Sequence, residues 1–235
     1  MSAAERARID GYLDSFFDER DDPRRRVLPG LRAEPWPDPA VVPGLALLEE
    51  NFETIRAEVT ALPGNAFHPE AEAIDRSGRW DVIFLYARGV RRQDNCAKLP
   101  ATMRVLDQLP IVDTFEGLTY CSRLAPGTRI GGHRGPTNLR LRCHLPLRVP
   151  AGDCAIEVGG TTRRWAEGRC LLFDDSFEHQ AWNYGDGDRI VLVVDVWHPD
   201  LTPLEIRVLR ELQRYAGAHA EDLHQFWTDH PRTGT

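Results

Sequence analysis

Several features are scarce or missing in this 235-residue sequence, and each excludes a class of protein. It has no run of about 18 apolar residues, which a membrane-spanning helix would need. Its first 26 residues contain no apolar segment of the kind that secretory signals carry. Internal repeats and low-complexity stretches are also missing. We therefore expect a globular, cytoplasmic protein without a membrane partner.

Lysine is almost absent, because Lys98 is the only lysine among 29 basic residues. A GC-rich genome accounts for such a bias, although arginine also offers a planar fork that binds carboxylates through two hydrogen bonds. The formal net charge is −7. Proteins that bind nucleic acids usually carry a basic surplus or a dense basic face, so we expect no nucleic-acid partner.

Cysteine pairs of the kind that hold zinc are missing as well. The five cysteines are odd in number, and none forms a CxxC or another zinc-binding spacing. Three lie in apparent strands, where cysteine behaves as a small core residue. The sequence thus predicts a reducing compartment and no disulfide framework. The cysteines are Cys96, Cys121, Cys143, Cys154 and Cys170.

The periodicity that is present predicts helices at both ends of the chain and strands between them. Residues 1–27 form a charged, helical N-terminal arm in this interpretation, and residues 28–235 form a single domain. Apolar residues three and four positions apart predict one helix over 42–62, and Thr202-Pro203 begins a helix that reaches residue 216. The expected strands are Val82–Ala87, Leu118–Leu124, Thr137–Val149, Cys154–Val158, Cys170–Phe173 and Arg189–Trp197.

Short strands separated by Gly, Pro and Asp turns favour a barrel or sandwich over a parallel α/β sheet. The expected fold is therefore mainly β with flanking α-helices. In this architecture helices come first, a β-barrel follows, and one helix closes the chain.

One predicted strand carries a polar stripe. Side chains alternate between the two faces of a strand, so Leu139, Leu141 and their apolar successors share one face. Asn138, Arg140, Arg142 and His144 share the other. This second face is either a solvated sheet surface or a socket for carboxylates in the mouth of a barrel. Alternation alone favours the solvated surface.

The strand from Arg189 to Trp197 is apolar on both faces in its middle and is therefore expected to be buried on both sides. Arg189 stands at its start, where its side chain can point into a pocket. A buried guanidinium needs an anion, supplied by the protein or by a ligand. The alternative partner within the chain is a local acid such as Asp186 or Asp188.

Two of the eight histidines stand out by context. His133 lies in a glycine-rich turn before the arginine strand, and His179 follows a strand end and a polar loop. Neutral imidazole binds Fe(II) well, and two histidines with one carboxylate are typical of non-haem iron oxygenases. The carboxylate normally stands two residues after the first histidine, where this chain has Gly135. Spacing alone therefore favours ordinary loop histidines.

Three segments together closely resemble the aspartyl/asparaginyl β-hydroxylase family: residues 133–145, 173–179 and 194–199. Weaker similarity extends the match to about residues 28–205. The resemblance implies a double-stranded β-helix, that is, a jelly-roll or cupin-like barrel. It also implies a 2-oxoglutarate-dependent dioxygenase that binds Fe(II) and 2-oxoglutarate and uses O2 as cosubstrate.

The resemblance also implies roles for individual residues. His133 and His179 match the catalytic iron ligands, and Gly135 matches the glycine that replaces the usual carboxylate. Arg189 matches the arginine that holds the distal carboxylate of 2-oxoglutarate. Arg140 is the candidate for binding a substrate carboxylate. The remaining cosubstrate-pocket residues implied in this way are Trp80, Ser122, Arg142, Cys143 and His144. Asp175 is expected not to ligate the metal, and either supports the ligands from behind or has a structural role.

The substrate is less well indicated than the reaction. Animal members of the family carry a luminal membrane anchor and act on EGF-like domains. In those proteins polar residues contact the substrate around positions 70–82, and this chain has the apolar Val82 there. We expect hydroxylation of an unactivated C–H bond in an aspartyl/asparaginyl-like or other amino-acid-like small molecule, or in a short peptide. Two alternatives remain: a halogenase, which also has glycine at the third ligand position, and a non-catalytic cupin-like binding module.

Overall fold

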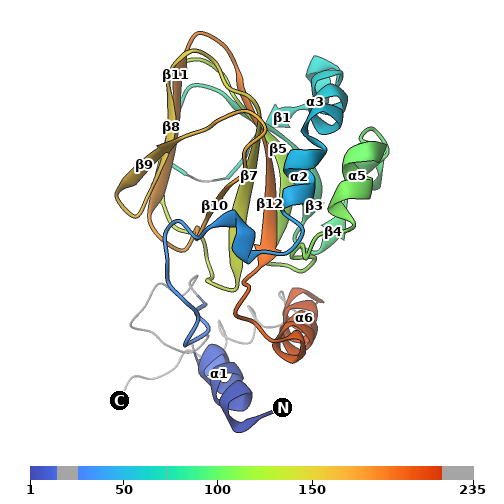
Figure 1. The fold of residues 1–235 in the computed structure, drawn as a ribbon, viewed down its shortest axis with the longest axis vertical. Coiled ribbons are helices and arrows are strands. Elements are labelled where there is room, and N and C mark those ends of the chain that lie inside the picture. The colour runs from blue at the N-terminus through green and yellow to red at the C-terminus, as the bar shows by residue number, and fades with distance from the viewer. Residues whose placement is uncertain (15–25, 73, 219–235) are drawn as a thin grey trace, which may run out of the picture.

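The computed structural model describes residues 1–14, 26–72 and 74–218, and its centre is built from β-strands (Figure 1). The six α-helices within these residues are α1 (Ala3–Asp14), α2 (Ala46–Glu50), α3 (Phe52–Thr60), α4 (Gln93–Cys96), α5 (Pro100–Leu106) and α6 (Pro203–Ala218). The strands are β1 (His68–Pro69), β2 (Arg76–Ser77), β3 (Trp80–Ala87), β4 (Val90–Arg91), β5 (Leu118–Leu124), β6 (Thr128–His133), β7 (Arg140–Arg148), β8 (Gly152–Val158), β9 (Thr161–Arg164), β10 (Leu171–Phe173), β11 (His179–Gly185) and β12 (Arg189–Trp197).

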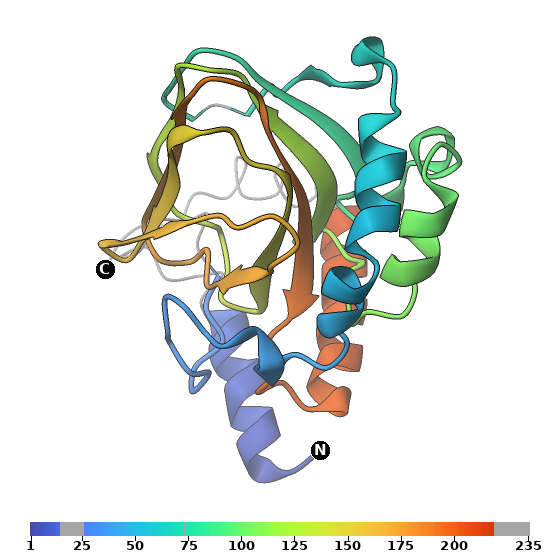
Figure 2. The ribbon, with the colours of Figure 1, turned by 45° about the horizontal axis from the view of Figure 1, so that its top comes forward.

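The strands form two antiparallel sheets. The larger sheet has the order β1-β3-β5-β12-β7-β10, with β4 paired to β3, and the smaller has the order β2-β6-β11-β8-β9. Figure 2 shows the two sheets enclosing a common interior, while α2, α3 and α5 lie on the outer side of the larger sheet. The prediction of a mainly β, jelly-roll-like barrel with flanking helices is confirmed.

Strand alternation divides the apolar residues into two layers. Along β7, Leu141 and Leu145 point outward into the layer beneath α2, α3 and α5. Along β12, Val191 and Val193 point inward and pack with Trp165 between the two sheets. The larger sheet is thus buried on both faces, which explains why β12 is apolar throughout its middle.

The single helix predicted over 42–62 is wrong, because the structure has two helices there. Asn51 separates α2 from α3 with φ −101° and ψ 13°, outside helical geometry. Its Nδ2 donates to the Leu47 carbonyl at 2.8 Å, which ends the first helix locally. The predicted apolar face survives the break, since Leu45, Leu48, Ile55 and Val59 are all buried.

Several elements were not predicted from the sequence. β6 contains glycines and β11 begins with polar residues, so neither shows a clear alternation of apolar side chains. α5 is short and depends on a distant residue, because the Glu58 carboxylate accepts hydrogen bonds from the backbone N–H groups of Ala101 and Thr102 at 2.7 Å. Tertiary contacts of this kind leave no local sequence signal.

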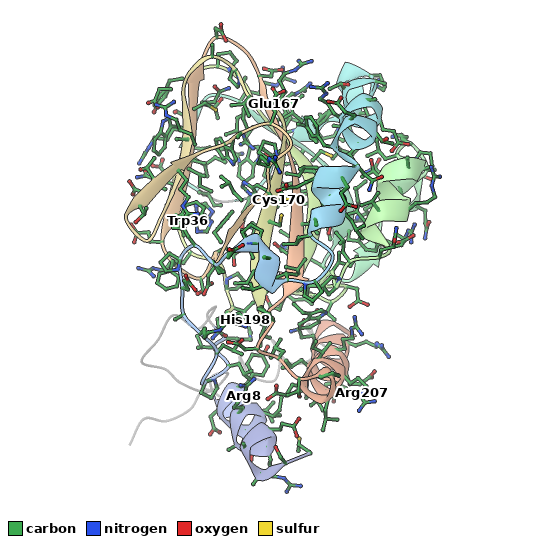
Figure 3. The ribbon with its side chains drawn as sticks, viewed as in Figure 1. Arg8, Trp36, Glu167, Cys170, His198 and Arg207 are labelled. Carbon is green, nitrogen blue, oxygen red and sulfur yellow. The ribbon has the colours of Figure 1, made fainter. Side chains whose placement is uncertain are left out.

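The described part of the N-terminal arm packs against the rest of the fold. Ile9 and Tyr12 of α1 are buried in an apolar cluster with Trp197 and Leu209. Arg8 forms an ion pair with Glu205 of α6 at 2.9 Å, and Figure 3 shows Arg8 at the end of the barrel near His198. Residues 15–25 of the predicted arm lie outside the described residues.

Two further expectations concern membranes and cysteines. None of the helices that the structure describes combines the length and the apolar character needed to cross a membrane. All five cysteines are buried free thiols. Burial fits the prediction that they act as small core residues.

Packing of α1 predicts a large difference between two truncations on the same helix. Ile9→Ala removes a buried side chain and should lower the free energy of unfolding by about 2–4 kcal/mol. Leu13→Ala alters an exposed side chain and should change it by less than about 0.5 kcal/mol. Urea denaturation followed by circular dichroism measures both, and equal, negligible effects would show that α1 is a loose arm.

Candidate active site

His133 and His179 meet across the smaller sheet. His133 ends β6, His179 begins β11, and the two residues are direct partners in the antiparallel register. Their ring centroids lie 4.1 Å apart. In each ring Nδ1 is bonded to a backbone carbonyl two residues earlier, at 2.8 Å to Gly131 and 2.9 Å to Phe177. A carbonyl only accepts, so both Nδ1 atoms carry the proton and both Nε2 lone pairs are available to a metal.

Burial keeps both rings neutral. Desolvation lowers the pKa of His133, and it lowers the pKa of His179 to about 4, assisted by repulsion from His133. An imidazole must be neutral to ligate a metal. The pair is therefore ready to bind a cation at neutral pH.

Gly135 leaves its side-chain position to Asp175. A Cβ atom at residue 135 would lie 2.6 Å from Oδ2 of Asp175, and the Gly135 N–H donates to the Asp175 carbonyl at 2.7 Å. Any larger residue would displace this carboxylate. Among the residues that the structure describes, no set of three or more His, Cys, Asp or Glu side chains could hold a metal ion.

Asp175 belongs to a buried cluster of four charges. Arg140 lies 2.8 Å from Asp175 and 2.6 Å from Asp195, and Arg142 lies 3.3 Å from Asp175 and 2.8 Å from Asp195. All four residues are buried. Burial alone would raise the pKa of Asp175, but the charges of Arg140 and Arg142 lower it to about 2. The carboxylate is therefore ionised under ordinary conditions.

The polar face of β7 points into the barrel. Arg140, Arg142 and His144 are all buried, so the interpretation of this face as a solvated surface is wrong and the alternative of a buried socket holds. Asn138 differs, because its amide bonds the backbone of Leu28 and fixes the N-terminal segment. The Arg140 guanidinium bonds acids of this chain and the Glu116 carbonyl. Its proposed contact with a substrate carboxylate stays a prediction.

Arg189 is the opposite case, a buried guanidinium without an acid. Its Nε and Nη1 are buried and have no hydrogen-bond partner among the described residues, so the alternative of pairing with Asp186 or Asp188 is wrong. The guanidinium lies 4.7 Å from the ring centroid of Trp165. Burial lowers the pKa of Arg189 to about 10, which still leaves it charged. Such a group is a site for an anionic ligand.

A line of ring contacts joins Arg189 to the paired histidines. Trp165 Nε1 donates to His144 Nδ1 at 3.3 Å, so neutral His144 keeps its proton on Nε2. The ring of Phe173 lies 4.9 Å from His144 and 5.8 Å from His179. Arg189, which has no acidic partner among the described residues, thus shares one interior with the two histidines.

Two predicted pocket residues meet on neighbouring strands of the larger sheet. Trp80 Nε1 donates to Ser122 Oγ at 3.0 Å, and both residues are buried. The Ser122 hydroxyl accepts in this bond and keeps its own proton for another acceptor. Tyr120 lies two residues from Ser122 on the same face, and burial raises the pKa of its hydroxyl to about 12.

The structure separates Cys143 from the other predicted pocket residues. Its side chain belongs to the layer between the larger sheet and the helices, on the opposite face of β7 from Arg142 and His144. Figure 3 shows Cys170, a member of the same layer, beside α2. Placing Cys143 in the cosubstrate pocket is therefore wrong for its side chain, because alternation turns that side chain outward.

Sequence reasoning gave no role to three residues of this interior: Trp165, Tyr120 and Asp195. Asp195 offered a signal, since it is the one acid within the apolar strand β12. Tyr120 shares the inward face of β5 with Ser122, which alternation could have shown. Trp165 lies in an irregular segment after β9 and had no local signal.

Comparison with known sequences identifies relatives over most of the chain. A sequence profile described as Aspartyl/Asparaginyl beta-hydroxylase matches residues 49–199. Aspartate beta-hydroxylase domain-containing protein 2 of Xenopus tropicalis is 42% identical over 193 residues, which cover 77% of this chain and 52% of that protein. Human aspartyl/asparaginyl beta-hydroxylase is 39% identical over 187 residues, which cover 77% of this chain and 25% of the human protein. The chain thus spans about half or less of these relatives.

Solved structures with similar folds are more distant. An oxidoreductase of the 2OG-Fe(II) oxygenase family from Burkholderia pseudomallei is 15% identical, with a TM-score of 0.44 over 62% of this chain and 78% of that chain. A predicted oxalate decarboxylase from Thermotoga maritima is also 15% identical, with a TM-score of 0.37 over 58% of this chain and 98% of that chain. The sequence profile matches more than half of the residues, which shows that this chain belongs to the aspartyl/asparaginyl β-hydroxylase family.

Proposed function

We propose that this protein is an Fe(II)- and 2-oxoglutarate-dependent dioxygenase that hydroxylates an unactivated C–H bond of an amino-acid-like molecule or short peptide. One observation carries the proposal: two neutral histidines with free Nε2 atoms share a buried interior with Arg189, whose Nε and Nη1 have no hydrogen-bond partner among the described residues. The first provides a metal site and the second an anion site. Membership of a family of β-hydroxylases supports the same conclusion.

The donor set fits Fe(II). His133 and His179 would hold the ion, because neutral imidazole suits this metal. The Nδ1 bonds of both rings fix their orientation, as is usual for histidines that bind metals. When bound, iron and 2-oxoglutarate would supply O2 activation for C–H hydroxylation, with release of succinate and CO2.

The anion site fits 2-oxoglutarate, which carries a carboxylate at each end. Arg189 would hold the distal carboxylate, since its buried Nε and Nη1 have no other partner in the part of the chain that the structure describes. Ser122 can add a hydrogen bond, because its hydroxyl proton is not used by Trp80. Trp80, Arg142 and His144 would complete the pocket.

We assign the substrate to the class of small amino-acid-like molecules or short peptides, without nucleic-acid or membrane partners. The protein's part in the reaction is to orient this molecule and to exclude water from the interior. Phe173, Trp165 and neighbouring apolar side chains line the interior and would exclude water from it. We place the protein in the cytoplasm, in keeping with five cysteines that remain thiols.

The geometry favours hydroxylation over halogenation. A halogenase with glycine at this position binds a halide in the space that the missing carboxylate leaves. Here the Asp175 carboxylate occupies the position that a side chain of residue 135 would take, and it is ionised. A halide would meet a like charge there, which costs free energy in a buried site. A binding module without turnover would also bind 2-oxoglutarate, so turnover separates that alternative.

Turnover tests the proposed function directly. Wild-type protein supplied with Fe(II), 2-oxoglutarate and O2 should form succinate, and the rate should rise when a suitable amino acid or short peptide is added. His133→Ala should lower succinate formation at least about 100-fold, because it removes a metal ligand itself, and losing even a residue that supports a ligand costs roughly 10- to 100-fold. Mass spectrometry with 18O2 should show one labelled oxygen in the product. A chlorinated product in chloride buffer would favour the halogenase, and binding without any turnover would favour the binding module.

Arg189 should contribute to 2-oxoglutarate binding and not to the stability of the protein without ligand. Arg189→Met replaces an unpaired buried charge with an apolar side chain of similar length, so the free energy of unfolding should stay equal or increase. The dissociation constant of 2-oxoglutarate, measured by calorimetry with the metal-loaded protein, should rise roughly 30-fold or more.

Arg123→Met is the matched control for Arg189→Met. Arg123 lies 2.8 Å from Asp81 on the outer face of β5, so its loss should lower stability and leave 2-oxoglutarate binding unchanged. An Arg189→Met protein that binds 2-oxoglutarate normally would refute the assigned anion site.

A further inference from the structure

Asp195 fixes the orientation of two arginines at once. It has no exposed surface and stands directly opposite Arg142 in the β12–β7 register. Its Oδ1 accepts from Arg142 Nε at 2.8 Å, and its Oδ2 accepts from Arg142 Nη2 at 2.9 Å. Oδ2 also accepts from Arg140 Nη1 at 2.6 Å and from the Leu118 N–H at 2.9 Å. One carboxylate thus holds Arg142 through two nitrogens and Arg140 through one.

Each arginine turns one further terminal nitrogen to the same atom of Asp175. Arg140 Nη2 lies 2.8 Å and Arg142 Nη1 3.3 Å from Oδ2 of Asp175. The other oxygen, Oδ1, is buried without a hydrogen-bond partner among the described residues. Buried carboxylate oxygens are normally bonded, so this atom is available to a group that the protein does not supply.

The free oxygen lies against Gly135, close in sequence to the first predicted metal ligand. A Cβ at Gly135 would be 2.7 Å from Oδ1 of Asp175, and Gly135 follows His133 by two residues. The carboxylate therefore occupies the space into which a third ligand from residue 135 would project. Whether Oδ1 stays free depends on how the arginines are held.

We propose that Asp195 is a positioning residue for the metal site. By gripping Arg142 side-on and Arg140 through Nη1, it commits both arginines to Oδ2 of Asp175 and keeps Oδ1 directed beside Gly135. Without Asp195, Arg142 would be released to bond both oxygens of Asp175, and the free acceptor would be lost. The inference rests on the proposed function, because it supposes that His133 and His179 bind the metal. Arg140 is part of the same arrangement, because its guanidinium joins Asp195 to Asp175.

Metal binding to the intact chain tests the proposal without any need for turnover. Asp195→Asn keeps the side-chain shape and removes its charge and one acceptor. Co(II), a spectroscopic substitute for Fe(II), should bind to this variant roughly 10- to 100-fold more weakly than to the wild type, as is typical when a group behind the metal ligands is lost. The visible absorption bands of the bound Co(II) should also shift.

Asp81→Asn provides a matched control. Asp81 is buried in β3 and also holds two arginines, with Arg79 at 2.8 Å and Arg123 at 2.8 Å, but it faces away from the interior. This variant should lose stability while its Co(II) dissociation constant and spectrum stay as in the wild type. Equal weakening of Co(II) binding in both variants would reflect general loss of structure and would overturn the proposal.

A second variant keeps the test decisive if Asp195→Asn does not fold. Arg140→Lys retains the charge, but a single ammonium lacks the fork that joins Asp195 to Asp175, so Co(II) binding should weaken in the same range. Wild-type affinity and spectrum in folded Asp195→Asn or Arg140→Lys would overturn the positioning role and leave the proposed function intact. Wild-type protein that fails to bind Co(II), or binding that survives His133→Ala, would overturn the proposed function instead.

Discussion

Charge pairing inside the barrel is the constraint on which the rest of the site depends. Arg140 and Arg142 project from β7 into a water-poor interior, where an uncompensated ion would cost several kcal/mol. Asp195 on the neighbouring strand and Asp175 on the loop before β11 balance them. These contacts tie the larger sheet to the loop that leads to His179. They also place a carboxylate against Gly135, which explains why that residue has no side chain.

Arg189 shows the complementary design in the same interior. Ion pairs join the four charges of the buried cluster, whereas this guanidinium keeps Nε and Nη1 without partners in the described part of the chain. Burying this guanidinium without a partner costs free energy of desolvation, which an anionic ligand would offset. The four paired charges lie at one end of the interior, and Arg189 at the other end would attract an anionic ligand. Trp165, His144 and Phe173 connect the two ends through ring contacts.

Local patterns predicted the elements whose apolar residues repeat regularly. β5 and β12 begin and end where expected, because their alternation or continuous burial is strong. Patterns did not reveal that neither face of β7 meets solvent, because helices α2, α3 and α5 cover the apolar face and the second sheet covers the polar one. The histidines were placed by resemblance, as β6 and β11 lack a periodic signal. The resemblance over residues 133–145 includes Cys143 among the pocket residues, but alternation along β7 turns its side chain to the outer layer.

We expect His133 and His179 to hold Fe(II) in the same interior that would take 2-oxoglutarate. Anaerobic titration of the purified protein with Fe(II) and 2-oxoglutarate is the first measurement to make, because their complex has a weak visible charge-transfer band. The band should form in the wild type and be lost in folded His179→Ala. A folded, metal-loaded wild type without the band, or a band that persists in His179→Ala, would contradict metal binding by the two histidines.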